Sequence, residues 1–170
     1  MNLRSGARNV ALSALMAALL IAGKFALQMI PNVEVVTIFI LLFSCCFGLA
    51  RTLPAVLVFC IVDPFLYGAV PTVVTQYFLH WPLLCVSAWL LSRVTKSEYA
   101  FLGLASAASV LFWLETPVIN VLFQFSPFMG TLVAGLPFFA INLISNGALV
   151  LVLFRPLSRV LEKVSNRLTL

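Results

Sequence analysis

The residues of this sequence that could do chemistry are a few ionisable side chains set among long apolar runs. They are Lys24, Glu34, Asp63, His80 and Glu115. An ionisable side chain inside a membrane is costly and usually faces a cavity or a partner. Such groups can bind a polar small molecule through charge and hydrogen bonds, or they can form the acid–base pair of an enzyme.

Catalysis finds little further support in the sequence. His80 is the single histidine of the chain, and a metal site or a nucleophile–base pair needs partners at a matching depth. Ser87 and Ser145 carry hydroxyls, but nothing marks either as activated. A GxxxxGK[ST] loop, which would hold the phosphates of ATP, is absent. We therefore expect no catalytic residue, no metal and no cofactor, and keep an intramembrane enzyme as an alternative.

The composition indicates that lipid is the solvent of most of the chain. Of the 170 residues, 63% are hydrophobic and 9% are charged, and the mean hydropathy is +1.15. A soluble domain carries about 25% charged residues. Since one helical crossing takes about 20 apolar residues, the length allows about five to six crossings. Little chain remains for a domain outside the membrane. We therefore expect the protein to interact with the lipid bilayer and not with nucleic acid.

The elements that must position the ionisable residues are membrane helices. Apolar runs separated by turn signals predict an all-α integral membrane protein with a single domain over residues 1–170. We expect the segment 118–130 to extend the fifth helix or to form a short re-entrant or capping loop. We expect residues 155–170 to form a basic amphipathic tail on the inner leaflet. The six expected helices span about 8–30, 35–50, 53–68, 71–92, 99–117 and 131–154.

The basic residues predict the orientation of the bundle. With both termini in the cytoplasm, nine of the ten Lys and Arg residues lie inside, and Lys24 is the exception. This is the distribution that the positive-inside rule requires. A five-helix chain would place the basic tail outside, against the rule. The nine inner residues are Arg4, Arg8, Arg51, Arg93, Lys96, Arg155, Arg159, Lys163 and Arg167.

In that arrangement, polar and aromatic side chains from different helices converge on the outer half of the bundle. Such a mixture suits a small, water-soluble, ring-bearing ligand, held by stacking and a few hydrogen bonds. A purely structural subunit would leave these groups unexplained. The candidate substrate-binding residues are Lys24, Asn32, Glu34, Asp63, Tyr67, His80, Trp81, Trp113, Glu115 and Asn142.

A ridge of small residues follows one face of the first helix. Ala14, Ala18 and Ala22 recur every four residues, which places them one above another on a helix. Small residues let another helix approach closely in lipid. The ridge is either a contact within the bundle or a docking face for another membrane protein.

These features together resemble the substrate-binding S-components of energy-coupling factor (ECF) vitamin importers. The resemblance covers nearly the whole chain. It rests on the small six-helix plan with basic cytoplasmic ends, the alanine ridge, the segment Gly23-Lys24-Phe25, the stretch PNVEVVT at 31–37 and the stretch NGALVLVLFRPL at 146–157.

The resemblance implies a transport function without intrinsic ATPase activity. A family member binds a vitamin or precursor near the outer face and docks onto a transmembrane scaffold subunit, and two cytoplasmic ATPases drive uptake. Ala14 and Ala18 would be the docking pair, extended by Ala22, and residues 31–37 would gate the pocket.

Cobalamin is the slightly favoured cargo, followed by pantothenate, whose negative charge would use Lys24. The expected location is the plasma membrane of a prokaryote. A self-sufficient small channel or transporter stays an alternative, although we find no internal repeat.

Overall fold

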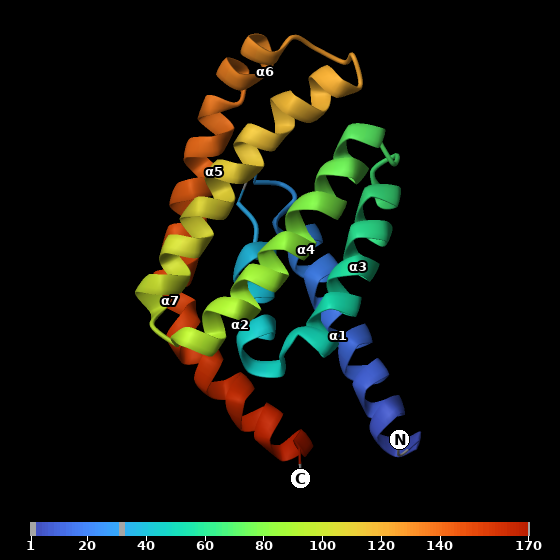
Figure 1. Ribbon diagram of the computed structural model, residues 1–170, viewed down its shortest axis with the longest axis vertical. Helices are drawn as coiled ribbons and strands as arrows, with labels where there is room; N and C mark the ends of the chain where they lie inside the picture. Colours follow the sequence, from blue (N-terminus) through green and yellow to red (C-terminus); the bar gives the residue numbers. More distant parts are fainter. Residues whose placement is uncertain (1–2, 31–32, 170) are drawn as a thin grey trace.

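The computed structural model describes residues 3–30 and 33–169, and all regular structure in these ranges is helical (Figure 1). Five helices are long and apolar enough to cross a membrane. The chain is therefore a multi-pass membrane protein, as its composition predicts. The helices are α1 (Leu3–Leu27), α2 (Val36–Phe47), α3 (Leu49–Leu66), α4 (Pro71–Val94), α5 (Glu98–Leu122), α6 (Phe128–Ala134) and α7 (Leu136–Thr169).

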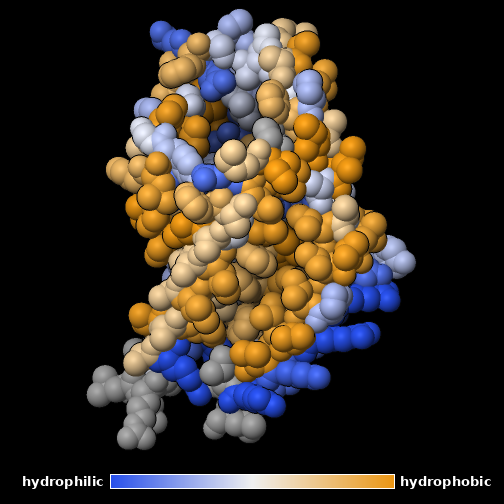
Figure 2. Space-filling model, turned by 180° about the vertical axis from the view of Figure 1, so that it is seen from behind, coloured by the Kyte–Doolittle hydropathy of each residue, from blue (hydrophilic) through white to orange (hydrophobic). Residues whose placement is uncertain are grey.

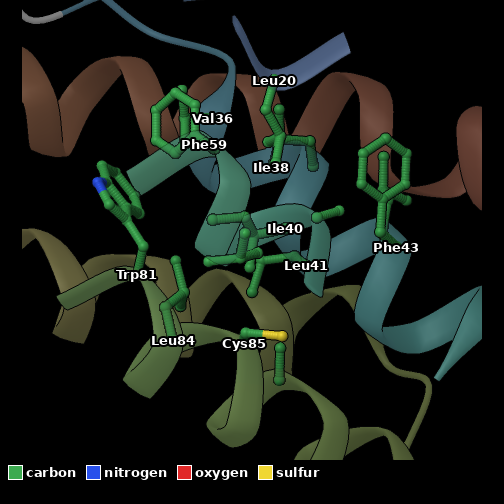
Figure 3. Close-up of a cluster of buried hydrophobic side chains, with 14 of the residues drawn as sticks. Leu20, Val36, Ile38, Ile40, Leu41, Phe43, Phe59, Trp81, Leu84 and Cys85 are labelled. Atoms are coloured by element: carbon green, nitrogen blue, oxygen red, sulfur yellow. The ribbon is translucent and has the colours of Figure 1, made fainter. Parts of the chain in front are cut away.

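The second expected crossing is a short core helix. The 12 residues of α2 cover about 18 Å at ~1.5 Å per residue, less than the ~30 Å hydrocarbon layer. It packs against α4 and α7, and most of its side chains are fully buried. Figure 3 shows Ile38, Ile40 and Leu41 of this helix among side chains from α1, α3 and α4. The helix thus fills the centre of the bundle, and the long helices around it face the lipid.

The segment 118–130 has no re-entrant loop. Helix α5 continues through Pro117 to Leu122, further than the expected end at 117, and a short turn leads into α6. Proline is tolerated in membrane helices because neighbouring groups satisfy the freed backbone. Figure 1 shows α6 capping the end of the molecule that lies away from both termini.

The basic tail is the continuation of α7. This helix has 34 residues, or about 51 Å, and passes the expected end at Phe154 without a break. Nε of Arg155 forms an ion pair with Oε2 of Glu98 at 2.6 Å, and Nζ of Lys96 forms one with Oε1 of Glu162 at 2.6 Å. The Ser165 hydroxyl donates to the carbonyl of Cys46 at 2.9 Å. These contacts hold the tail against the end of the bundle. The sequence had predicted instead that the tail lies on the inner leaflet of the membrane.

The two ends of the molecule differ in character. The chain begins and finishes at the same end (Figure 1). Figure 2 shows strongly hydrophilic residues gathered at that end, an apolar belt above it, and a hollow with hydrophilic residues in the other half. The polar hollow and the charged end are therefore separated by the width of the apolar belt.

Gly23 allows α1 to lie close to the start of α2. A Cβ atom at this position would sit 2.6 Å from Cγ2 of Val35 and 2.9 Å from Cε2 of Phe39. We expect Gly23→Ala to reduce the free energy of unfolding by about 1–3 kcal/mol, because overpacking forces neighbours apart. Unfolding in detergent micelles measures this. Gly103→Ala is the matched control, since nothing lies within 4 Å of its Cβ. Equal stability of the two variants would contradict the prediction.

Candidate functional site: a two-part pocket

Two adjoining cavities lie in the half of the bundle away from the termini. They measure about 360 and about 350 Å³ and share the side chains of Val73, Tyr77 and Phe112. We call the first the acidic cavity; its other lining residues include Lys24, Gln28, Glu34, Asp63 and Tyr67. We call the second the aromatic cavity; its other lining residues include Gln76, Ser109, Trp113, Phe138, Phe139 and Asn142.

Lys24 is held by an ion pair at the base of the acidic cavity. Its Nζ lies 2.6 Å from Oδ2 of Asp63 and also donates to the Tyr77 hydroxyl. The Asp63 side chain is 3% exposed and that of Lys24 is 21% exposed. Both residues stand near the ends of helices, where α1 packs along α3. The positive charge of Lys24 is thus neutralised within the protein.

Aromatic rings surround the Lys24 ammonium. Its Nζ lies 4.6 Å from the ring centroid of Tyr77 and 5.7 Å from that of Tyr67. Aromatic faces attract a cation within about 6 Å. The Tyr67 hydroxyl also donates to Oε1 of Gln28 at 2.8 Å, which joins α3 to α1 beside the cavity. This part of the pocket favours positive charge.

Glu34 lines the acidic cavity from the connection between α1 and α2. It takes part in none of the ion pairs of the described chain, and its carboxyl has the Asn142 side chain as a hydrogen-bond partner. Burial raises the pKa of Glu34; the nearby Lys24 and His80 oppose this, and Asp63 adds to it. The cavity therefore contains one carboxyl without an ionic partner.

The aromatic cavity is built around Trp113. Its ring stacks on Phe139 with centroids 4.9 Å apart, and its indole N–H donates to the carbonyl of Leu132 at 3.1 Å. Gly135 makes room for the ring, because a Cβ there would lie 3.1 Å from Cδ1 of Trp113. The indole is thereby fixed in orientation before any ligand arrives.

Amide side chains tie the walls of the aromatic cavity together. Gln76 on α4 donates to the carbonyl of Phe112 and to the Thr116 hydroxyl, both at 2.8 Å. Asn146 on α7 donates to the Ser109 hydroxyl and to Oδ1 of Asn142, both at 3.0 Å. Polar contacts of this kind hold membrane helices in register. They make the cavity a preformed feature of the bundle.

His80 and Glu115 form a pair behind the cavity walls. Nδ1 of His80 lies 3.1 Å from Oε2 of Glu115, and neither residue lines the acidic or the aromatic cavity. The imidazole packs edge-on against Trp81 and Phe112, with centroids 4.8 and 4.9 Å away. Trp81 (Figure 3) is 1% exposed, and its indole nitrogen has no hydrogen-bond partner among the described residues. These three residues support the shared wall at Phe112.

The structure brings most of the predicted site residues to one place. Lys24, Glu34, Asp63 and Tyr67 line the acidic cavity, and Trp113 and Asn142 line the aromatic cavity. The prediction for Asn32 lies outside the described residues. His80, Trp81 and Glu115 are not among the residues that line the two cavities.

The sequence prediction left out Gln28 and Phe112, which line the acidic cavity. Helical spacing carried a signal for both. Gln28 is one turn after Lys24, and Phe112 is one turn before Glu115. Residues one helical turn before or after a predicted polar residue are therefore further candidates for lining the cavity.

The alanine ridge of α1 faces away from the bundle. Ala14, Ala18 and Ala22 are exposed, whereas Met16 and Leu20 on the opposite face are buried. Of the two interpretations that the sequence left open, a contact within the bundle is therefore excluded. The ridge faces lipid or another protein.

Comparisons with protein-family models, with curated proteins and with solved structures give no match. The fold and the site define a class: a multi-pass α-helical membrane protein with a preformed polar pocket in one half of its bundle.

Proposed function

We propose that this chain is the substrate-binding S-component of an ECF-type importer. In this role it captures a water-soluble vitamin or precursor outside the cell and delivers it with a transmembrane scaffold subunit. Two cytoplasmic ATPases supply the energy, and the chain itself catalyses no reaction. The observation that carries the proposal is the pocket, which gathers ionisable side chains from α1, α3 and the α1–α2 connection in an otherwise apolar bundle.

The cost of those ionisable groups favours a binding function. Charged groups at membrane depth are expensive and are retained mainly where they act on a ligand or ion. Each cavity lies within the range of about 300–1,000 Å³ that is typical of small-molecule sites. An enzyme would present its acid–base pair to the substrate, but the His80–Glu115 pair stands behind the wall.

The proposed topology has six membrane segments, the five long helices and α2, with both termini in the cytoplasm. The positive-inside rule supports it, since the basic residues gather at the end where the chain begins and finishes. The pocket then opens toward the outside of a prokaryotic plasma membrane. The exposed alanine ridge supports docking, because Ala14, Ala18 and Ala22 offer a close approach to a partner helix.

The cavities favour a cargo of modest size. A corrin ring with its side chains is larger than either cavity, so cobalamin would have to lie mostly at the mouth. Pantothenate is an anion, and the cation that would receive it, Lys24, already pairs with Asp63. Both expected cargoes thus fit this geometry less well than a smaller molecule without negative charge.

A thermal-shift screen tests the proposal. We expect at least one water-soluble vitamin or precursor to stabilise the purified chain in detergent, by about 2.7 kcal/mol at 100 times its Kd. Trp113→Ala should weaken that ligand about tenfold through loss of stacking. Trp89→Ala is the matched control, since Trp89 packs under Arg93 outside both cavities. No stabilisation by any compound would contradict the proposal.

A further inference from the structure

We infer that the ligand of this site is an organic cation, with its positive charge beside Glu34 and a flat ring in the aromatic cavity. A protonated amine or a positively charged heterocycle would meet this description. The inference rests on the proposed function and specifies the charge and shape of the substrate.

The first step is the charge balance of the acidic cavity. Its lining contains one basic residue, Lys24, and two acidic residues, Asp63 and Glu34. Asp63 and Lys24 neutralise each other at 2.6 Å, so the carboxyl of Glu34 is the group left without an opposite charge. Burial raises the pKa of this carboxyl and so favours its neutral form in the empty cavity; a cation supplied by the ligand would stabilise the ionised form, whereas an anion would meet no opposite charge there.

The next charged groups do not change that balance. His80 lies near Glu34, but its Nδ1 already faces the carboxylate of Glu115 at 3.1 Å. The remaining basic residues belong to the end of the bundle where both termini lie, or to its surface. An anionic ligand would therefore find no unengaged basic side chain among the described residues that line the two cavities.

The rings of the acidic cavity point to the same ligand charge. Tyr67 and Tyr77 already surround one ammonium group, and both also line the cavity in which a ligand would lie. The attraction of an aromatic face for a cation grows as water is excluded. A quaternary or protonated nitrogen gains from these rings as well as from Glu34.

The shape of the ligand follows from the shared wall. Since Tyr77 and Phe112 line both cavities, the two cavities are adjacent, and a ligand with its charged part in the acidic cavity and its ring in the aromatic cavity would have to pass between or displace these side chains. In the aromatic cavity, the indole of Trp113 is held in place by its own hydrogen bond and offers a surface for stacking. Gln76 and Asn142 line the same cavity, and each is already hydrogen-bonded within the protein.

Matched probes can separate charge from shape. The affinity of the full chain in detergent would be measured for 1-methylnicotinamide, nicotinamide and nicotinate, which share one ring and carry a positive, zero and negative charge. Water-soluble vitamins of each charge would be titrated beside them, with thiamine as a cation that has two rings. We expect the tightest ligand to be a cation and nicotinate to bind at least about tenfold more weakly than 1-methylnicotinamide.

The variant Glu34→Gln should weaken the cations about tenfold and leave nicotinamide unchanged, because it removes the charge and keeps the shape. Glu162→Gln is the matched control at the other end of the bundle, in a surface ion pair. A neutral or anionic tightest ligand would overturn the inference, and so would a cation preference that survives Glu34→Gln. Both results would leave the proposed function standing, whereas the absence of any binding would overturn the two together.

Discussion

Lys24→Met is expected to lower the free energy of unfolding by about 3 kcal/mol. The variant leaves the Asp63 carboxylate, which is almost completely buried, without its ionic partner. Breaking a buried pair costs about 3–5 kcal/mol, and the partial exposure of Lys24 places this pair at the lower end of the range. Equilibrium unfolding of the purified protein in mixed micelles measures the effect.

Two further variants separate the buried charge from the loss of the lysine side chain. Lys24→Met combined with Asp63→Leu removes both charges, so we expect it to recover most of the lost stability. Lys96→Met breaks an exposed pair with Glu162 of the same length and should cost less than about 1 kcal/mol. If Lys24→Met lowered the free energy of unfolding no more than Lys96→Met does, the Lys24–Asp63 pair would be solvated and the prediction would be wrong.

The sequence could predict the long helices because each is a run of apolar residues near the length of a bilayer crossing. It could not predict the length of α2. Residues 35–50 are uniformly apolar, and the helix ends where Gly48 adopts a φ of 78° between α2 and α3. In the same way, Pro117 suggested a helix end that the packing of α5 overrides. Local signals compete with tertiary packing at both places.

The depth of the candidate site could be predicted, but not its partners. Positions along the helices placed Lys24, Asp63 and Glu115 in one half of the bundle. Which of them meet depends on how each helix is rotated, and a helix that is apolar all round carries little signal of its inward face. Hence the pairing of Lys24 with Asp63, and of His80 with Glu115 behind the wall, emerged only from the structure.

The alanine ridge of α1 shows the same limit of sequence-based prediction. Its spacing showed that Ala14, Ala18 and Ala22 share one face, but not whether this face points into the bundle. The structure resolves the direction, since these alanines are exposed while Met16 and Leu20 pack into the core. An outward ridge of small residues is what a close contact with a second membrane protein requires.

Ala14→Trp and Ala18→Trp are therefore expected to abolish ligand uptake in cells that carry the partner subunits. A tryptophan on the ridge would prevent the close approach of the proposed scaffold helix, because the indole occupies the space that the small residue leaves open. Ligand binding by the purified variants should stay within about twofold of the original protein. The ridge and the two cavities have no residue in common. Uptake of radiolabelled ligand and titration in detergent measure the two properties separately.

Ala107→Trp is the matched control, since Ala107 is an exposed alanine on α5 and lies outside the ridge. It introduces the same bulk toward lipid and should leave uptake intact. If both ridge variants transported normally, docking through α1 would be wrong, although the pocket could still bind its ligand. If they lost binding together with uptake, the ridge would support the fold of the site, and its exposure would need a different physical reason.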